Sequence, residues 1–220
     1  MNGEQKRDSR KLHWEQIYNT KPPTEVSWYQ TYPSLSIKLI NATGIKKEEN
    51  IIDVGGGASL LVDYLLDSSF TKLAVLDISH AAIKLAKHRL GKRANNVEWF
   101  EADVTEFQSP HKFELWHDRA VFHFLTDEED RKRYMRVLKD TMTPSGHLII
   151  ATFAIDGPKK CSGLDVVRYD AKSLSAQVGS EFELLEEIDE THMTPANVEQ
   201  KFTYFRFKRL SNLMSATHSL

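Results

Sequence analysis

The 220-residue chain has the composition of a soluble globular protein, with 40% hydrophobic and 27% charged residues. Its formal net charge of −2 lacks the basic excess expected of a protein that binds nucleic acid, and no apolar run approaches the roughly 18 residues that a membrane span needs. A single cysteine, Cys161, excludes an internal disulfide framework and a cysteine-based zinc site, and no other metal site is indicated.

The N-terminal quarter is predicted to be helical and aromatic. Leu12 and Ile17, with neighbouring aromatics, predict a helix over residues 9–20. An aromatic loop with three prolines follows over 22–33, and a second helix over 34–45 ends near Gly44.

Strands and helices then alternate. Ser79 is the expected N-cap and Gly91 the stop of a helix over 79–91, and Thr126 is the expected N-cap of a helix over 126–146. Alternation of this kind predicts a doubly wound parallel sheet. The strands expected in this part are 50–55, 72–78, 97–102, 113–118 and 147–154.

The last third has a different pattern. After a helix over 170–179, the segments 181–193 and 199–209 follow one another with only a loop between them, and the second segment alternates aromatic with polar residues. Two such strands should pair antiparallel, so we expect a mostly parallel α/β sheet that ends in an antiparallel hairpin.

The segment DVGGGAS, residues 53–59, follows the first strand of this sheet and allows three interpretations. A triphosphate-binding P-loop would need a Lys-Ser or Lys-Thr pair that is absent here. A dinucleotide fingerprint would need glycine where Leu60 stands. The third interpretation depends on acids: Asp53 suits an ammonium group, Asp77 at the next strand end suits two ribose hydroxyls, and Asp103 would reach an adenine edge.

These motifs together resemble the class I S-adenosylmethionine-dependent methyltransferases, over roughly residues 10–208. The resemblance implies S-adenosylmethionine as cofactor, S-adenosylhomocysteine as product, and a seven-stranded sheet of order 3-2-1-4-5-7-6 with an antiparallel last strand and helices on both faces. It implies an N-terminal cap over the cofactor at 1–45, a catalytic core at 46–210 and a tail at 211–220. The cofactor contacts that it implies are Asp53, Gly55, Gly56, Gly57, Ser59, Asp77, Ile78, Asp103, Val104, Asp118, Arg119 and Ala120.

Several side chains are candidates for the acceptor side of the site. His123 is the candidate base or substrate contact, with packing as an equal alternative, whereas packing is preferred for His117. Cys161 is expected to be inert. A lid over the cofactor is favoured over simple core packing for Trp14, Tyr18, Trp28 and Tyr29, of which Trp28 is also a candidate cofactor contact and Tyr18 and Tyr29 candidate substrate contacts. Arg168 and Tyr169 are further candidate substrate contacts, with ordinary salt bridging as the alternative.

The sequence therefore predicts a methyltransferase that acts on a small molecule, with a protein lysine side chain as the alternative acceptor. A non-catalytic cofactor-binding interaction module is the third hypothesis. A missing general base would not argue against methyl transfer, because positioning provides most of the acceleration. The N-terminus shows no secretory signal, so the cytoplasm is the expected compartment, with the protein a monomer or homodimer.

Overall fold

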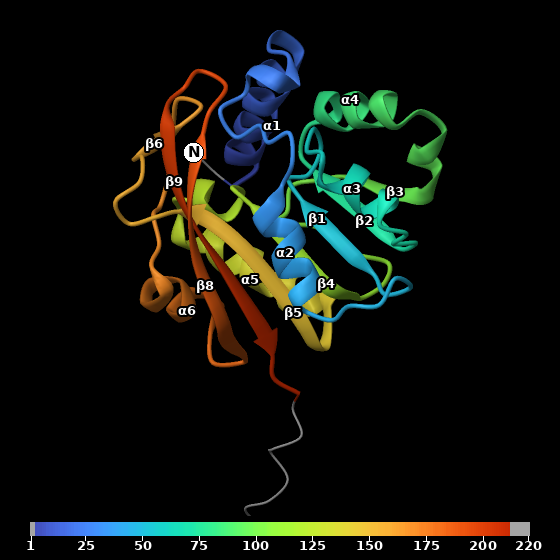
Figure 1. Ribbon diagram of the computed structural model, residues 1–220. Coiled ribbons are helices and arrows are strands. Elements are labelled where there is room, and N and C mark those ends of the chain that lie inside the picture. The colour runs from blue at the N-terminus through green and yellow to red at the C-terminus, as the bar shows by residue number, and fades with distance from the viewer. Residues whose placement is uncertain (1–2, 212–220) are drawn as a thin grey trace, which may run out of the picture.

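The computed structural model describes residues 3–211 and contains the expected mixed sheet (Figure 1). Its seven strands lie in the order β3-β2-β1-β4-β5-β9-β8, and β9 runs antiparallel to both of its neighbours. Numbered within this sheet alone, the order is the expected 3-2-1-4-5-7-6, so the predicted fold class is confirmed. The strands are β1 Ile51–Val54, β2 Leu73–Asp77, β3 Val97–Glu101, β4 Phe113–Arg119, β5 Met142–Phe153, β8 Phe182–Met193 and β9 Glu199–Arg209.

Helices cover both faces of the sheet. One face packs against α2, α3 and α4, and the other against α5 and α6. Two short strands form a separate hairpin that the sequence did not predict. The helices are α1 Gly3–Thr20, α2 Ser34–Ala42, α3 Leu61–Asp67, α4 His80–Leu90, α5 Glu128–Thr141 and α6 Ala171–Val178, with short turns η1 Pro23–Glu25, η2 Gly91–Asn96 and η3 Phe122–Phe124, and the hairpin strands are β6 Lys160–Cys161 and β7 Leu164–Asp165.

The central strands are buried on both faces, which explains their continuous apolar runs. Ile51 and Val75 pack beneath α2 and α3, whereas Ile52 and Leu76 pack on the opposite side beneath α5. Every residue of β1 and β2 is buried. The ends of these strands are therefore held in fixed positions by core packing on both sides.

The boundaries of α4 were predicted correctly. The Ser79 hydroxyl accepts a hydrogen bond from the Ala82 N–H at 3.1 Å, and Gly91 ends the helix with a φ of +58°. This N-cap stands two residues after Asp77, the last residue of β2, so it fixes the short turn that follows Asp77.

The predicted boundaries of α5 were wrong at both ends. Asp127, not Thr126, is the N-cap, and its carboxylate accepts a hydrogen bond from the Glu129 N–H at 3.0 Å. The helix ends at Thr141 because Pro144 cannot donate a helical hydrogen bond, and β5 starts at once with Met142.

The predicted division into a cap, a core and a tail stays a prediction. Within the expected cap, α1 is longer than predicted and lies over the carboxyl edge of the sheet (Figure 1), whereas Leu39 and Ile40 of α2 pack into the sheet core. Residues 212–220 of the expected tail lie outside the described residues. Among residues 3–211, no helix has the length and apolar character needed to cross a membrane.

A buried polar cluster fixes the end of β4 to α5. The Tyr134 hydroxyl donates to Asp118 at 2.6 Å and accepts a hydrogen bond from the Trp116 indole at 2.9 Å. All three side chains are fully buried. Their polar atoms depend on one another, because no water can replace a lost partner.

We expect Tyr134→Phe to lower the free energy of unfolding by about 1–3 kcal/mol, because it leaves the Asp118 carboxylate and the Trp116 N–H without this partner. Urea unfolding should show this loss. Tyr32→Phe is the control, since Tyr32 is 53% exposed. Equal stability of Y134F and the wild type would contradict the role of this cluster.

Candidate cofactor and acceptor site

The carboxyl ends of β1, β2 and β4 meet at one edge of the sheet and carry three buried acids. Asp53 of β1 lies in register with Val75 and His117, and Val54 lies in register with Asp118. Asp77 is the last residue of β2. Two adjoining cavities open at this edge, and five residues line both of them: Tyr18, Trp28, Val54, Gly55 and Arg119.

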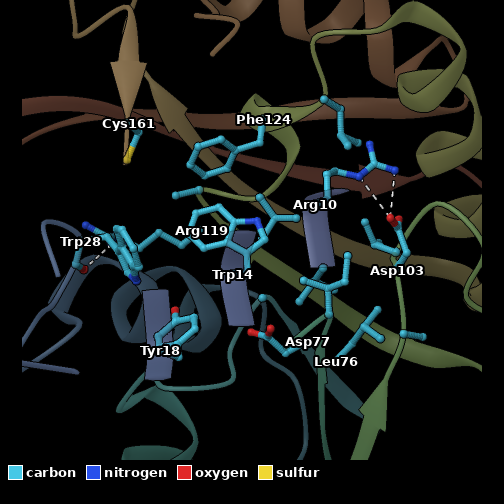
Figure 2. A pocket seen from close by; sticks show the side chains of 18 residues that line it. Arg10, Trp14, Tyr18, Trp28, Leu76, Asp77, Asp103, Arg119, Phe124 and Cys161 are labelled. Atoms are coloured by element: carbon cyan, nitrogen blue, oxygen red, sulfur yellow. Dashed lines mark hydrogen bonds and ion pairs between the residues drawn. The ribbon is translucent and has the colours of Figure 1, made fainter. Parts of the chain in front are cut away.

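The first cavity has an acidic end and an aromatic end (Figure 2). Asp77 and Asp103 lie at the acidic end, together with the predicted contacts Ile78 and Val104. Trp14, Trp28 and Phe124 surround the other end, beside Cys161 (Figure 2). The sequence did not predict that Arg10, Val121, Phe124 and Leu125 would line this cavity.

Asp77 is held in place by backbone donors. Its carboxylate accepts hydrogen bonds from the Gly57 N–H at 3.0 Å and the Ser79 N–H at 2.8 Å. Burial raises its pKa to about 6, although the two backbone donors favour the charged form. A Cβ on Gly57 would lie 2.6 Å from the carboxylate, so only glycine fits there. This placement fits the expected role as an acceptor for ribose hydroxyls.

Asp103 connects the acidic end of the first cavity to α1. The Arg10 guanidinium donates to Asp103 Oδ2 at 2.8 Å (Figure 2) and also to Asp130 Oδ2 at 2.7 Å. The other Asp103 oxygen accepts hydrogen bonds from the Thr105 N–H and hydroxyl. The sequence did not predict Arg10 as a site residue. Its ion pair with Asp103 joins residues 93 positions apart, and no local pattern indicates such a pair.

The glycine turn has close neighbours on both sides. Gly55 has a φ of +69°, and a Cβ there would lie 2.1 Å from the Val121 side chain. A Cβ on Gly56 would lie 2.2 Å from Asp53 Oδ2. The turn therefore passes directly over the buried acid of β1, and a side chain would fill the space beside it. Ser59, also predicted as a contact, lines the second cavity and accepts a hydrogen bond from the Leu61 N–H at 3.1 Å.

The second cavity lies beside the glycine turn, and Asp53 is one of the residues that line it. Asp53 Oδ1 lies 2.7 Å from His117 Nδ1, whereas the buried Oδ2 has no hydrogen-bond partner among the described residues. Such an atom fits a ligand that brings its own donor, as the expected ammonium group would. Tyr29 also lines this cavity.

Trp14 of helix α1 lines the first cavity and packs against two further aromatic side chains. Trp14 makes edge contacts with Trp28, at 5.5 Å between ring centroids, and with Phe124, at 5.0 Å. The carboxylate of Glu15 on the same helix accepts hydrogen bonds from the His80 and Ala81 N–H groups at the start of α4. An acid at a helix N-terminus is favourably placed, so this contact ties the lid to the core.

His123 does not line either cavity, in contrast to its predicted role as a base. It is fully buried, its Nδ1 accepts a hydrogen bond from the Phe153 N–H at 3.3 Å, and its ring packs against Phe124, Phe153 and Phe202. Burial lowers its pKa to about 3, and the nearby Arg119 acts in the same direction. The packing alternative describes the environment of His123. His117 is also buried, but it lines the second cavity and its two ring nitrogens lie within hydrogen-bond distance of Asp53 and Ser36.

Three other predicted contacts also lie outside the two cavities. Asp118 accepts hydrogen bonds from Tyr134 and from the Val121 and Phe122 N–H groups of the turn after β4. Arg168 donates to the Gly157 carbonyl at 3.2 Å, and Tyr169 is buried in the core beneath α5. Arg119 and Ala120, predicted together with Asp118, do line the first cavity.

Cys161 lies at the aromatic end of the first cavity, where its thiol is expected to be unreactive. Burial raises the pKa of its thiol to about 11, so the thiolate form is scarce at neutral pH. Within residues 3–211, no group of three His, Cys, Asp or Glu side chains is arranged to hold a metal ion.

Comparisons with known proteins agree with this geometry. Residues 52–148 match the family model of the methyltransferase domain. Over this stretch, which is less than half of the chain, the protein is similar to methyltransferase domains, and its fold is shared by solved S-adenosylmethionine-dependent methyltransferases. The described residues fit the cofactor of this family: Asp77 is available to ribose hydroxyls, the glycines leave room, and Asp53 keeps a buried oxygen without a partner.

The similar proteins differ in what they act on. The eEF1A lysine and N-terminal methyltransferase of Mus musculus is 31% identical over 120 residues, which are 54% of this chain and 17% of that protein. Malonyl-[acyl-carrier protein] O-methyltransferase 2 of Ilyobacter polytropus is 25% identical over 134 residues, 58% of this chain and 50% of that protein. The crystal structure of the N-methyltransferase NodS from Bradyrhizobium japonicum with S-adenosylhomocysteine shares the fold, with a TM-score of 0.67 and 16% identity over 89% of this chain and 97% of that one.

Affinity for S-adenosylhomocysteine should depend on pH through Asp77. Its carboxylate is the expected acceptor of ribose hydrogen bonds, and with a pKa of about 6 it becomes protonated as the pH falls. Calorimetric affinity should therefore be constant above about pH 7 and decrease below about pH 6.

Asp77→Asn is the control, because the amide does not titrate. We expect weaker binding by about 2 kcal/mol and loss of the pH dependence near 6. Wild-type affinity that stays constant from about pH 5 to about pH 8 would contradict the assignment of this acid.

The lid should control how fast the ligand leaves. Arg10→Ala removes both mostly buried ion pairs of α1, so the dissociation rate of S-adenosylhomocysteine should rise about tenfold in stopped-flow measurements. Lys6→Ala on the same helix removes only the half-exposed pair with Asp127 and should change the rate less than about twofold. Equal rates for the two variants would show that α1 does not retain the ligand.

Proposed function

We propose that this chain transfers a methyl group from S-adenosylmethionine to a small-molecule acceptor bound at the aromatic end of the first cavity. The proposal is carried by one observation: a single cavity joins the Asp77 and Asp103 end to an apolar end under the α1 lid. The first end fits an adenosine, and the second end offers space for an acceptor beside it.

The size of the acceptor is limited by the lid. Trp14 and Phe124 lie in contact above the aromatic end, and Glu15 and Arg10 fix the helix that carries Trp14. A small molecule can be enclosed in such a space and shielded from water. A large substrate would require displacement of α1 and of the ion pairs that hold it.

The cofactor supplies an electrophilic methyl group on a sulfonium when it is bound. The contribution of the protein is then to bind, align and exclude water. Asp77 holds the ribose end, and the glycine turn lets the backbone approach closely. Arg119 and Ala120 at the end of β4 shape the wall between the two ends of the cavity.

No described residue at the aromatic end is suited to remove a proton from the acceptor. The Cys161 thiol is neutral at physiological pH, burial raises the pKa of the Tyr18 hydroxyl, and the Arg119 guanidinium is a cation. Asp77 and Asp103 belong to the opposite end. The acceptor should therefore arrive with an available lone pair, as a neutral amine or an anion does.

A protein lysine or N-terminal amine is the second candidate acceptor. It is favoured by the similarity to the mouse eEF1A lysine and N-terminal methyltransferase, although this chain spans only 17% of that protein. The third hypothesis, a non-catalytic interaction module, has less support. All three strand-end acids are present beside the close-packed glycine turn, and a non-catalytic cofactor-binding scaffold need not retain all three.

The direct test uses methyl-labelled S-adenosylmethionine with a metabolite extract and, separately, a protein extract. We expect label in a small-molecule product, and no transfer by Asp77→Asn in the same extracts. Label that entered proteins alone would favour the second candidate. Binding of the cofactor without transfer to either extract would favour the interaction module.

A further inference from the structure

Arg119 places a guanidinium at the aromatic end of the first cavity, beside Trp28 (Figure 2). Its side chain is only 10% exposed. The other charged side chains that line this cavity in the described part of the chain belong to the acidic end, and they are Arg10, Asp77 and Asp103. A cation is costly to bury in apolar surroundings unless anions or dipoles compensate its charge.

Three neutral partners hold the guanidinium in one orientation. Its Nε donates to the Tyr204 hydroxyl of β9 at 2.7 Å, and its Nη1 donates to the Trp28 carbonyl at 2.9 Å. The planar group also lies over the Phe202 ring, 4.6 Å from the ring centroid. These partners fix the position of the positive charge, but they carry no negative charge that would neutralise it.

Glu190 is the one carboxylate among residues 3–211 that pairs with Arg119, and the contact is long. Glu190 Oε2 lies 3.4 Å from Arg119 Nη2, and Glu190 Oε1 accepts a hydrogen bond from the Gln30 amide at 3.0 Å. A guanidinium that pairs fully with a carboxylate forms two parallel hydrogen bonds of about 2.8 Å. The charge of Arg119 is therefore only partly compensated.

The neighbouring titratable groups respond to an excess of positive charge. Burial is the main cause of the lowered pKa of His123, and Arg119 lowers it further. Burial also lowers the pKa of His192 most, and there Arg119 has a larger effect than the opposing Glu190. Burial raises the pKa of the Cys161 thiol to about 11, whereas Arg119 acts to lower it. All three effects of Arg119 have the sign that a positive potential produces.

Arg119 keeps donors for a ligand. Of the five N–H groups of a guanidinium, Tyr204 takes the one on Nε, Trp28 one on Nη1 and Glu190 one on Nη2. One N–H on each terminal nitrogen is thus left without a partner among the described residues. The two oxygens of a carboxylate are the matching acceptors. Cys161, whose thiol responds to the Arg119 charge, lines the first cavity but not the second, which places this charge beside the acceptor space.

We propose that Arg119 binds a carboxylate of the acceptor, so that the substrate class is a small carboxylic acid. This inference rests on the proposed function and names the chemistry of its acceptor. Oxygens that accept hydrogen bonds from a guanidinium have their lone pairs engaged, so the methylated atom is another atom of the same molecule. The carboxylate anchors and aligns the acceptor, and the product keeps its negative charge.

The first test uses the charge of the acceptor. A metabolite extract is passed over an anion-exchange resin at neutral pH, and both fractions are incubated with the full-length protein and methyl-labelled S-adenosylmethionine. We expect a labelled small molecule only from the retained fraction after its elution with salt, and we expect the product to be retained again. A labelled product from the unretained fraction, which holds neutral and cationic molecules, would overturn the inference.

A phosphatase separates the two common kinds of anion. Treatment of the eluted fraction with alkaline phosphatase, followed by removal of the enzyme, should leave the labelling unchanged, because a carboxylate is not a substrate of a phosphatase. Loss of labelling after this treatment would show that the acceptor is a phosphate ester and would overturn the assignment of a carboxylate.

The second test uses variants of the anion site. Arg119→Gln should raise the half-saturating amount of the eluted fraction about tenfold, whereas the calorimetric affinity for S-adenosylhomocysteine should change less than about twofold. Tyr204→Phe removes only the hydroxyl that orients Nε, so it should fold even if R119Q does not, and it should raise the half-saturating amount about threefold.

Arg206→Gln is the matched control. Arg206 is on the same strand as Tyr204, its side chain is 12% exposed, and it pairs with Glu186 at 2.6 Å outside both cavities. R206Q therefore removes a similarly enclosed cation from the same part of the sheet. Both the half-saturating amount and the affinity for S-adenosylhomocysteine should stay at their wild-type values.

The outcomes separate this inference from the proposed function. Equal weakening of S-adenosylhomocysteine and acceptor binding by R119Q would show that Arg119 serves the cofactor, and the inference would be wrong. A wild-type half-saturating amount in both R119Q and Y204F would overturn it as well. If no small molecule from either fraction acquired the label, the proposed function itself would be wrong.

Discussion

Three carboxylates buried at the ends of adjacent parallel strands impose the main constraint on this structure. Each needs hydrogen-bond donors, because a buried charge without partners is costly. Asp118 obtains them from Tyr134 and the turn after β4, and Asp77 from the Gly57 and Ser79 amides. Asp53 obtains one from His117 and keeps an oxygen without a partner. The fold therefore provides Asp118 with its hydrogen-bond donors, whereas Asp77 and Asp53 remain available to a ligand.

The surrounding elements follow from this constraint. The glycine turn must pass close to Asp53 and Asp77, and a Cβ on Gly56 or Gly57 would collide with these acids. Helix α1 is then held over the same edge by acids that accept hydrogen bonds from backbone and guanidinium donors: Glu15 at α4, and Asp103 and Asp130 at Arg10. The strand-end acids and the contacts that hold α1 thus lie at the same edge of the sheet.

Much of the fold and of the adenosine end could be predicted because their signals are local. Apolar runs marked the strands, Ser79 and Gly91 marked α4, and each acid lay at or just beyond the end of an expected strand. The acceptor side could not be predicted in the same way. His123 and Tyr169 follow strands as site residues do, yet their side chains turn into the core, and Arg10 reaches the site through an ion pair from 93 residues away. Side-chain direction and distant pairing leave no periodic pattern in a sequence.

The edge of the sheet at the carboxyl ends of β1, β2 and β4 should bind an adenosyl amino acid in preference to a phosphate-containing cofactor. Titration calorimetry with S-adenosylhomocysteine and, in parallel, with NAD⁺ tests it directly. Both ligands contain adenosine, but the pyrophosphate of NAD⁺ would meet the buried Asp53 carboxylate, and Leu60 stands where a dinucleotide fingerprint has glycine. We predict one-to-one binding of S-adenosylhomocysteine and no measurable binding of NAD⁺. Binding of NAD⁺ with equal or higher affinity would contradict the account.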